Sequence, residues 1–564
     1  MAPHVVAQHH RPPVRVSLAC TPCRSKHLRC DALTPVCSRC HADGKDCVYP
    51  KSRRGGRHRS KAPRPSCDEV SFAEGQLPDQ GQSVFDPTTS CSAHSDASSI
   101  SNADGTLISQ FYACFHPAHP CVLPQWAMNR HMTMNSGELQ LLTSVMQYIG
   151  AVYARSVSLA VQKDTVERNL SSLGTVTGFD VQAVLLYSIA IYWGDESKRA
   201  LELLDKTINM AWELGMNRQS FASEQGMNNP ILEESWRRTW WQIYVTDAHI
   251  AGSTHTFPFR TSNAVMDVDL PCEETAYEDG DIPRPRTLAE YDMREFAGDD
   301  SLQFSSFAEL ACLTRSLDLV LACRKGSNAT NAHVICANLD ACVLAWRSLL
   351  PPSKKEIMRA DGSFDEILFK ANMIIHTYMV DVHRQLSTLE YSPVESVAHC
   401  APPPPSAALG HGRQDRQLHT AKVLRSIEQF NDLLTLPTNI AVHTPFIICM
   451  IANIVIAQLS ACRFVFKGHQ LRLARERVRM SMGSLKVLSE FWPMGSRTYQ
   501  EVGIIAREIL GLVDRNPRLD HVTQDAIADV GVIELMNPPP LVSDTLSLDM
   551  NFDFCGLFDQ VVCD

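Results

Sequence analysis

Six cysteines between residues 20 and 47 carry the clearest chemistry of the chain. Their spacing is C-x2-C-x6-C-x6-C-x2-C-x6-C, which is two copies of C-x2-C-x6-C joined by six residues. Thiolates at x2 spacing can hold one soft divalent cation, and tetrahedral sulfur sites favour zinc. Because two zinc ions would need eight private ligands, two thiolates must bridge both ions, and the repeat points to Cys20 and Cys37. The six are Cys20, Cys23, Cys30, Cys37, Cys40 and Cys47.

A disulfide framework and a metal buffer both fit these cysteines less well. Disulfide frameworks belong to small secreted domains, and the first 16 residues contain no apolar signal-peptide core. A thiol-rich metal buffer would not need the four basic residues of the loop that follows Cys23. The sequence therefore predicts a metal cluster.

The loop between Cys23 and Cys30 has the side chains of a nucleic-acid-binding element. A short helix clamped at both ends by metal ligands fits the major groove of DNA, where Lys and Arg donate to guanine O6 and N7. Any one of these cations alone is expected to be a solvated surface charge, but the group favours DNA binding. The residues are Arg24, Lys26, His27 and Arg29.

Charge is distributed unevenly along the chain. Residues 11–66 hold 14 Lys and Arg against three Asp, whereas the rest of the 564 residues hold 38 Lys and Arg against 59 Asp and Glu. A compact basic module on an acidic body is typical of localised nucleic-acid binding. The 14 other cysteines are scattered, many in apolar runs, and are expected to be buried free thiols of a reducing compartment.

Residues 17–50 resemble the fungal binuclear zinc cluster, Zn(II)2Cys6, of transcription factors. All six cysteines match, the basic loop stands where the family carries its DNA-reading helix, and Pro35 stands in the linker where the family has a proline turn. The resemblance implies two zinc ions per chain, a nuclear protein, and double-stranded DNA with CGG-type half-sites. Lys26 and His27 match the pair that reads base edges, although the family often has two consecutive Lys or Arg there.

The segments around the module are expected to be disordered. Residues 1–16 form a polar arm, and residues 51–105 form a basic and then Ser/Asp-rich linker. No sustained apolar heptads follow the cluster, so a homodimer is left open. The cations after the cluster predict a nuclear localisation signal, a DNA backbone clamp or both, with a solvated linker as the alternative. They are Lys51, Arg53, Arg54, Arg57, Arg59 and Lys61.

Residues 106–535 predict a large all-α regulatory domain, because helical periodicity dominates and strand alternation is scarce. The uncharged run 446–462 is shorter than the ~20 apolar residues of a membrane span, and it predicts a buried core helix with no membrane contact. Within residues 197–214 one helix face carries Leu201, Leu204, Ile208 and Trp212, and Gly215 ends the helix. The helical runs span residues 138–162, 180–193, 197–214, 305–350, 364–387, 418–436, 446–464 and 470–492.

A second resemblance covers residues 108–390. An R-R-x-W-W stretch at residues 237–241 precedes a D-x-D-L-P stretch at residues 267–271, in the order seen in the middle homology region of fungal zinc-cluster regulators. On physical grounds, Trp240 and Trp241 are expected to anchor helix packing, while the two arginines pair with nearby acids.

The tail, residues 536–564, is acidic and hydrophobic. No Lys or Arg follows Arg518, and five aspartates interleave with apolar side chains after residue 540. This alternation predicts an activation segment for transcriptional coactivators, and the alternative is a terminus packed on the body. The anchors of the predicted segment are Phe552, Phe554, Leu557 and Phe558.

These features predict a sequence-specific transcription factor of RNA polymerase II. Family resemblance adds the expectation of an activator for a pathway-specific fungal gene set, such as a secondary-metabolite cluster. His27 keeps open the alternative of a co-regulator or repressor that acts mainly through protein contacts. The chain has no G-x-S-x-G, Walker, G-x-G-x-x-G or H-E-x-x-H motif, and its histidines show no second metal-ligand spacing, so no enzyme is expected.

Overall fold

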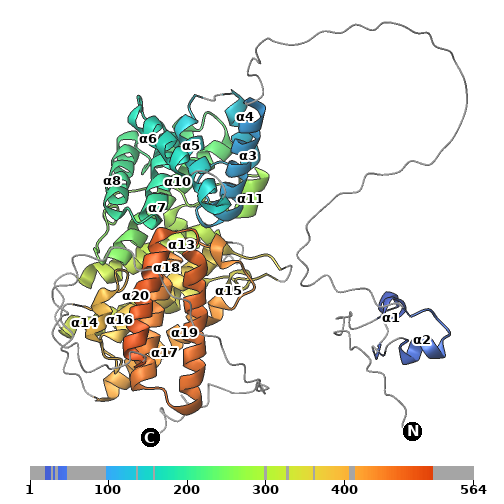
Figure 1. Cartoon of the computed structure of the whole chain (residues 1–564). Helices are drawn as coiled ribbons and strands as arrows, with labels where there is room; N and C mark the ends of the chain where they lie inside the picture. Colours follow the sequence, from blue (N-terminus) through green and yellow to red (C-terminus); the bar gives the residue numbers. More distant parts are fainter. Residues whose placement is uncertain are drawn as a thin grey trace, which may run out of the picture. The chain divides into compact units, whose positions relative to one another are not determined.

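The structure, a computed structural model, describes two compact units, one within residues 1–91 and the other within residues 92–564 (Figure 1). The predicted arm 1–16, the basic segment 51–61 and the tail 536–564 lie outside the described residues. Among the described residues no strand occurs, and only two isolated β-bridges form. The described ranges are 20–26, 30–31, 33, 36–47, 97–134, 137–155, 159–296, 302–324, 329–359, 362–404 and 413–511.

The first unit is built around sulfur. Its two described helices are α1 (Thr21–Ser25) and α2 (Ser38–Ala42). So short a segment cannot bury an apolar core of its own. Its buried centre consists instead of cysteines, with Cys30 and Cys47 packed against the four that are fully enclosed. These four are Cys20, Cys23, Cys37 and Cys40.

The second unit is a helical body, and the fold class predicted from the sequence is confirmed. In Figure 1 the helices of its first half gather at one end of the body and those of its second half at the other. The first half contains α3 (Ala97–Cys114), η1 (His116–Ala118), α4 (Gln125–Met134), α5 (Gln140–Ala154), α6 (Leu159–Ser171), α7 (Gly178–Trp193), α8 (Ser197–Leu214), α9 (Gln219–Gln225), α10 (Pro230–Thr254), α11 (Glu274–Asp279), α12 (Leu288–Asp292) and η2 (Arg294–Phe296).

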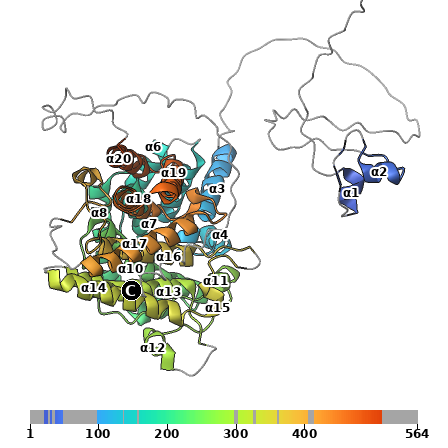
Figure 2. The ribbon, with the colours of Figure 1, turned by 90° about the horizontal axis from the view of Figure 1, so that it is seen from below.

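The second half of the body surrounds one apolar helix, α18. Figure 2 shows α18 among α16, α17, α19 and α20, all of which contact it. By length and composition α18 could cross a membrane, but 83% of its apolar window is buried inside the body, which confirms the expected core helix. The elements are α13 (Ser306–Leu321), η3 (Ala322–Arg324), α14 (Ala329–Leu349), α15 (Pro352–Lys355), α16 (Glu366–Arg384), η4 (Pro393–Val397), α17 (Arg413–Leu434), η5 (Ile440–Val442), α18 (Ile447–Phe464), α19 (Gly468–Leu488) and α20 (Pro493–Ile509).

Local chain chemistry explains where several helices begin and end. Helix α8 ends at Leu214 because Gly215 adopts a left-handed conformation with φ of 76°. The predicted run 138–162 is two helices instead of one, because the chain turns at Arg155, also left-handed with φ of 53°. Helix α3 begins at Ala97, inside the predicted linker, where Ser, Asn and Asp precede the apolar face.

The buried face of α8 differs from the predicted one at its edges. Leu204 and Ile208 are buried, but Leu201 and Trp212 are 39% and 36% exposed. The face of α8 that packs in the body is completed instead by Ala200, Leu203, Thr207, Met210 and Ala211, and the helix contacts α7. Trp212 lies instead against Arg260, whose guanidinium carbon is 5.5 Å from the ring centroid.

Helix α10 carries the R-R-x-W-W stretch and organises the first half of the body. Asn229 caps its start by accepting a hydrogen bond from the Ile231 amide at 3.1 Å. Trp240 and Trp241 are fully buried, as predicted, and the Trp241 indole donates to the Asp269 carbonyl at 2.9 Å. The same indole therefore fixes the D-x-D-L-P stretch against the helix.

The two arginines of that stretch pair with buried acids, as predicted. Glu234 accepts hydrogen bonds from Arg237 at 2.9 Å and from Arg238 at 2.8 Å. Arg238 also donates to the Glu274 carboxylate and to the Cys272 carbonyl, each at 2.8 Å. The side chains of Arg238 and Glu234 have almost no exposed surface, so this charged network is buried inside the body. Removing one partner would leave the opposite charge buried without its full set of partners.

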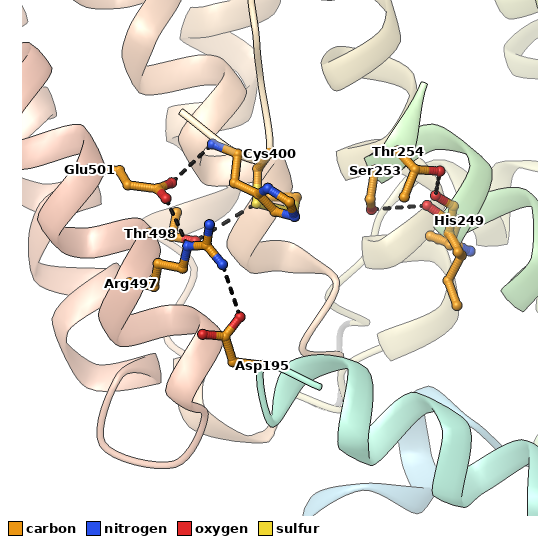
Figure 3. Close-up of a disulfide and its surroundings, with 11 residues drawn as sticks. Asp195, His249, Ser253, Thr254, Cys400, Arg497, Thr498 and Glu501 are labelled. Atoms are coloured by element: carbon orange, nitrogen blue, oxygen red, sulfur yellow. Dashed lines mark hydrogen bonds and ion pairs between the residues drawn. A yellow bond between two sulfur atoms is a disulfide. The ribbon is translucent and has the colours of Figure 1, made fainter. Parts of the chain in front are cut away.

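One pair of cysteines departs from the free thiols expected from the sequence. Cys400 and Cys449 form a disulfide with Cα atoms 5.1 Å apart, although 49 residues separate them in the chain. Figure 3 shows Cys400 beside Thr498 of α20, where the sulfur lies 3.7 Å from the hydroxyl. The expectation was wrong for this pair because the two sulfurs meet only when α18 packs against the segment that contains Cys400. The spacing of cysteines in the sequence does not indicate that packing.

Candidate metal centre and nucleic-acid interface

The six cysteine sulfurs of the first unit gather into two overlapping groups of four. Within each group all four Sγ atoms lie within 4.8 Å of one another. Cys20 and Cys37 belong to both groups, and their sulfurs are 3.7 Å apart. The first group adds Cys23 and Cys30, and the second adds Cys40 and Cys47.

The distances between the sulfurs suit a tetrahedral zinc ion. Zinc–sulfur bonds of about 2.3 Å place tetrahedral sulfurs about 3.8 Å apart. Cys20 Sγ lies 3.6 Å from Cys40 Sγ and 3.7 Å from Cys30 Sγ, and Cys23 Sγ lies 3.8 Å from Cys37 Sγ. A disulfide would need about 2.05 Å. The donor set and the spacing therefore fit zinc binding.

The two halves of the unit position their sulfurs in the same way. In each half one cysteine precedes a short helix and the next lies inside its first turn. Cys37 caps α2 by accepting a hydrogen bond from the Cys40 amide at 3.4 Å, and the Cys37 amide donates to Cys47 Sγ at 3.3 Å. Asp31, which the sequence did not single out, accepts from the Ser38 amide at 3.2 Å and fixes the start of α2.

Packing sulfurs together changes their acidity in opposite directions. Burial raises the pKa of the Cys20 and Cys23 thiols, whereas the Cys40 amide lowers the pKa of Cys37 by hydrogen bonding to its sulfur. A cysteine binds a metal ion as its thiolate, so a bound cation must displace protons from this group. Metal affinity of the unit is therefore expected to fall at acid pH.

The structure describes part of the loop that is predicted to contact DNA. Arg24 lies on α1, and Lys26 follows the helix as an exposed residue. His27 and Arg29 lie outside the described residues. Arg39 on α2 is a further exposed cation that the sequence did not mark, while Lys45 pairs with Asp43 at 2.8 Å.

The helical body contains an apolar cavity between α10, α13, α16 and α18. His249, Asp318, Tyr378 and Asn453 are among its lining residues, and Figure 3 shows His249 near the disulfide. Its volume is about 60 Å³. A cavity of about 150 Å³ is what benzene occupies in a protein core, whereas one water needs about 10–15 Å³. In this conformation the cavity has room for a few waters.

Two domain families match the chain. Residues 18–56 match the fungal Zn(2)-Cys(6) binuclear cluster domain, and residues 180–328 match the fungal specific transcription factor domain. The second match lies inside the stretch 108–390 that resembles the middle homology region.

Two curated relatives are named as transcription factors. The C6 finger domain transcription factor iacK of Pestalotiopsis fici is 28% identical over 575 residues, which cover 90% of this chain and 82% of the relative. The sorbicillinoid biosynthetic cluster transcription factor sor3 of Hypocrea jecorina is 41% identical over 59 residues, which cover 10% of this chain and 9% of the relative. No solved structure matches the chain. The chain therefore carries a fungal Zn(2)-Cys(6) binuclear cluster domain in its sulfur-rich first unit and a fungal specific transcription factor domain in its helical body, and it is similar to a C6 finger domain transcription factor over 90% of its length.

Proposed function

We propose that the protein is a DNA-binding activator of RNA polymerase II transcription that works in the nucleus on a pathway-specific gene set. The observation that carries the proposal is the pair of sulfur groups that share Cys20 and Cys37 next to exposed Lys26. The name of sor3, a biosynthetic-cluster regulator, supports a secondary-metabolite gene set as the target. Import into the nucleus would use the basic segment 51–61.

We further propose that the unit binds two zinc ions. One ion would take the four sulfurs of the first group and the other the four sulfurs of the second, so Cys20 and Cys37 would bridge them. When bound, the ions supply no chemistry beyond holding the two short helices in a fixed arrangement. Structural zinc sites of this closed kind stabilise folding directly.

The proposed DNA contacts divide into two kinds. Lys26 and His27 would face base edges of a CGG-type half-site in the major groove, and Arg24 and Arg29 would contact phosphates. The exposure of Lys26 supports this assignment, because a base-reading side chain must extend from the protein surface into the groove. Phosphate contacts alone would give binding without sequence preference.

Replacing Lys26 with alanine tests the base-reading role. We expect the full chain with Lys26→Ala to lose about 5- to 150-fold in affinity for a CGG-containing duplex, the equivalent of about 1–3 kcal/mol for one base contact. Affinity for a scrambled duplex should change much less. Lys45→Ala is the matched control, because Lys45 is already paired with Asp43. Equal weakening on both duplexes would assign Lys26 to a phosphate instead.

A regulator that works mainly through protein contacts is the second candidate. The departure at His27 favours it, because imidazole is mostly neutral at pH 7 and donates less strongly to guanine than Lys or Arg. Under this alternative the zinc cluster would still fold, but the chain would bind CGG-containing and scrambled duplexes equally.

We propose that the tail recruits coactivators. Residues 536–564, fused to an unrelated DNA-binding domain, should activate a reporter gene. Combined Phe552→Ala, Phe554→Ala and Phe558→Ala should abolish activation, because each buried aromatic contributes about 1.5–3 kcal/mol. As the matched control, changing the aspartates of the tail to asparagine should weaken activation gradually. An inactive fusion, together with loss of body stability when 541–564 are deleted, would make the tail a packing element.

A further inference from the structure

Three side chains with metal-binding atoms meet inside the helical body, far along the chain from the sulfur cluster. Cys336 comes from α14, His383 from α16 and His419 from α17. Their sulfur and ring nitrogen atoms all lie within 4.8 Å of one another. The three residues are 2%, 0% and 6% exposed, so solvent does not compete for these atoms.

The two imidazoles point the same ring atom at each other. The Nδ1 atoms of His383 and His419 are 2.8 Å apart, a distance that only one shared proton can bridge. On its far side, His383 Nε2 lies 3.2 Å from a carboxylate oxygen of Asp340, at ion-pair distance but outside good hydrogen-bond alignment. That carboxylate favours a proton on Nε2, which leaves the Nδ1 lone pair of His383 facing the cluster.

A carboxylate behind a histidine is the usual outer partner of a metal-bound imidazole. It fixes the ring orientation and raises the basicity of the nitrogen that binds the metal. Here Asp340 is held in turn by Lys422, whose ammonium group pairs with its other oxygen at 2.5 Å. Asp340 lies one helical turn after Cys336 on α14, so one helix supplies both the thiol and the outer carboxylate.

We propose that Cys336, His383 and His419 form a metal site of the body for a zinc-class divalent cation. One sulfur and two imidazole nitrogens are donors that such borderline cations take readily, and the fourth position is left for a water. Tetrahedral bonds of about 2.05 Å would place the two nitrogens about 3.3 Å apart. Binding therefore needs the 2.8 Å pair to open by about half an ångström, with the cation taking the place of the shared proton.

The buried charges at such a site offset one another. A divalent cation, the Cys336 thiolate and the Asp340 carboxylate sum to zero, and the one remaining positive charge, on Lys422, lies at the outer edge with 32% of its side chain exposed. Buried charges are tolerated when they are paired in this way. The bound ion would tie α14, α16 and α17 together and so stabilise the second half of the body.

Zinc content of the full chain tests the site, measured after incubation with excess zinc and removal of loosely bound ion. We expect three zinc ions per chain, two ions in Cys336→Ala and three in Cys342→Ala, the control on the same helix. The double variant Cys20→Ser, Cys37→Ser should keep one ion. Two ions in the wild-type chain, unchanged by Cys336→Ala, together with none in the double variant, would overturn the proposal and leave a plain histidine–histidine hydrogen bond.

The visible spectrum of bound cobalt(II) provides a second readout, which does not depend on counting zinc ions. In the Cys20→Ser, Cys37→Ser background, cobalt should give the intense visible bands of a tetrahedral site and a thiolate charge-transfer band. Adding Cys336→Ala should remove both, whereas adding Cys342→Ala should not. Cys336→Val, which fills the volume of the sulfur, replaces Cys336→Ala if tryptophan fluorescence shows loss of the fold. Octahedral cobalt spectra in every variant would contradict the site.

Discussion

Replacing Cys37 with serine is expected to release both of the zinc ions proposed for the first unit, whereas replacing Cys47 should release only one. Cys37 belongs to both sulfur groups, and its sulfur also caps α2. Structural zinc contributes about 10–16 kcal/mol of apparent binding free energy to small zinc domains at neutral pH. A module whose buried centre consists of cysteines has no apolar core to replace that contribution. The Cys37→Ser unit should therefore be unfolded and inactive on DNA.

Metal analysis and DNA binding of the same preparations measure this difference. Cys47→Ser is the matched comparison, because Cys47 belongs to the second group alone. Cys312→Ser, a buried cysteine of α13, controls for the loss of a thiol elsewhere and should retain the zinc of the first unit. Loss of one zinc ion from each of Cys37→Ser and Cys47→Ser would show that Cys37 is not shared.

Replacing Arg238 with alanine is expected to destabilise the helical body by about 3–5 kcal/mol, the cost of breaking a buried ion pair from one side. The Arg238 guanidinium donates to two carboxylates and to the carbonyls of Pro120 and Cys272. Without it the Glu274 carboxylate loses its arginine, and Glu234 keeps Arg237 and the Cys272 amide. Because a domain is stable by only about 5–15 kcal/mol, this single change removes a large share.

Urea unfolding followed by tryptophan fluorescence measures the loss, since all eight tryptophans lie at or after position 126 and report the body alone. Arg199→Ala is the control: its arginine is 45% exposed and pairs with surface acids, so the expected cost is about 0–1 kcal/mol. If Arg238→Ala unfolds at the same urea concentration as Arg199→Ala, the buried network is not what holds α10 to the segment 267–274.

The parts of this molecule that sequence predicted are those governed by local spacing. The sulfurs of one half are all within ten residues of each other, so their meeting needs only a short loop. The end of α8 at Leu214 follows from one glycine, and the burial of Trp240 and Trp241 follows from their size and position on a long helix. In each case the interactions that determine the structure lie within one helix or loop, or between residues that are close together in the sequence.

The parts that sequence missed depend on packing between distant elements. Cys336, His383 and His419 are separated by 47 and 36 residues, so their meeting is fixed by how α14, α16 and α17 pack and not by any motif. The Cys400–Cys449 disulfide is of the same kind. The exposure of Leu201 also depends on which face of α8 packs against the body, and helical periodicity alone does not fix the edges of that face.

Competition binding of the full chain to DNA tests the central claim most directly. A fluorescent duplex with CGG half-sites is titrated at fixed salt against unlabelled CGG and scrambled duplexes, before and after zinc is stripped by a chelator. We predict that the CGG duplex competes at least about 10³-fold better than the scrambled one, that stripping zinc abolishes the difference, and that zinc restores it. Equal competition by both duplexes, or specific binding that survives complete removal of zinc, would contradict a zinc-dependent, sequence-reading activator.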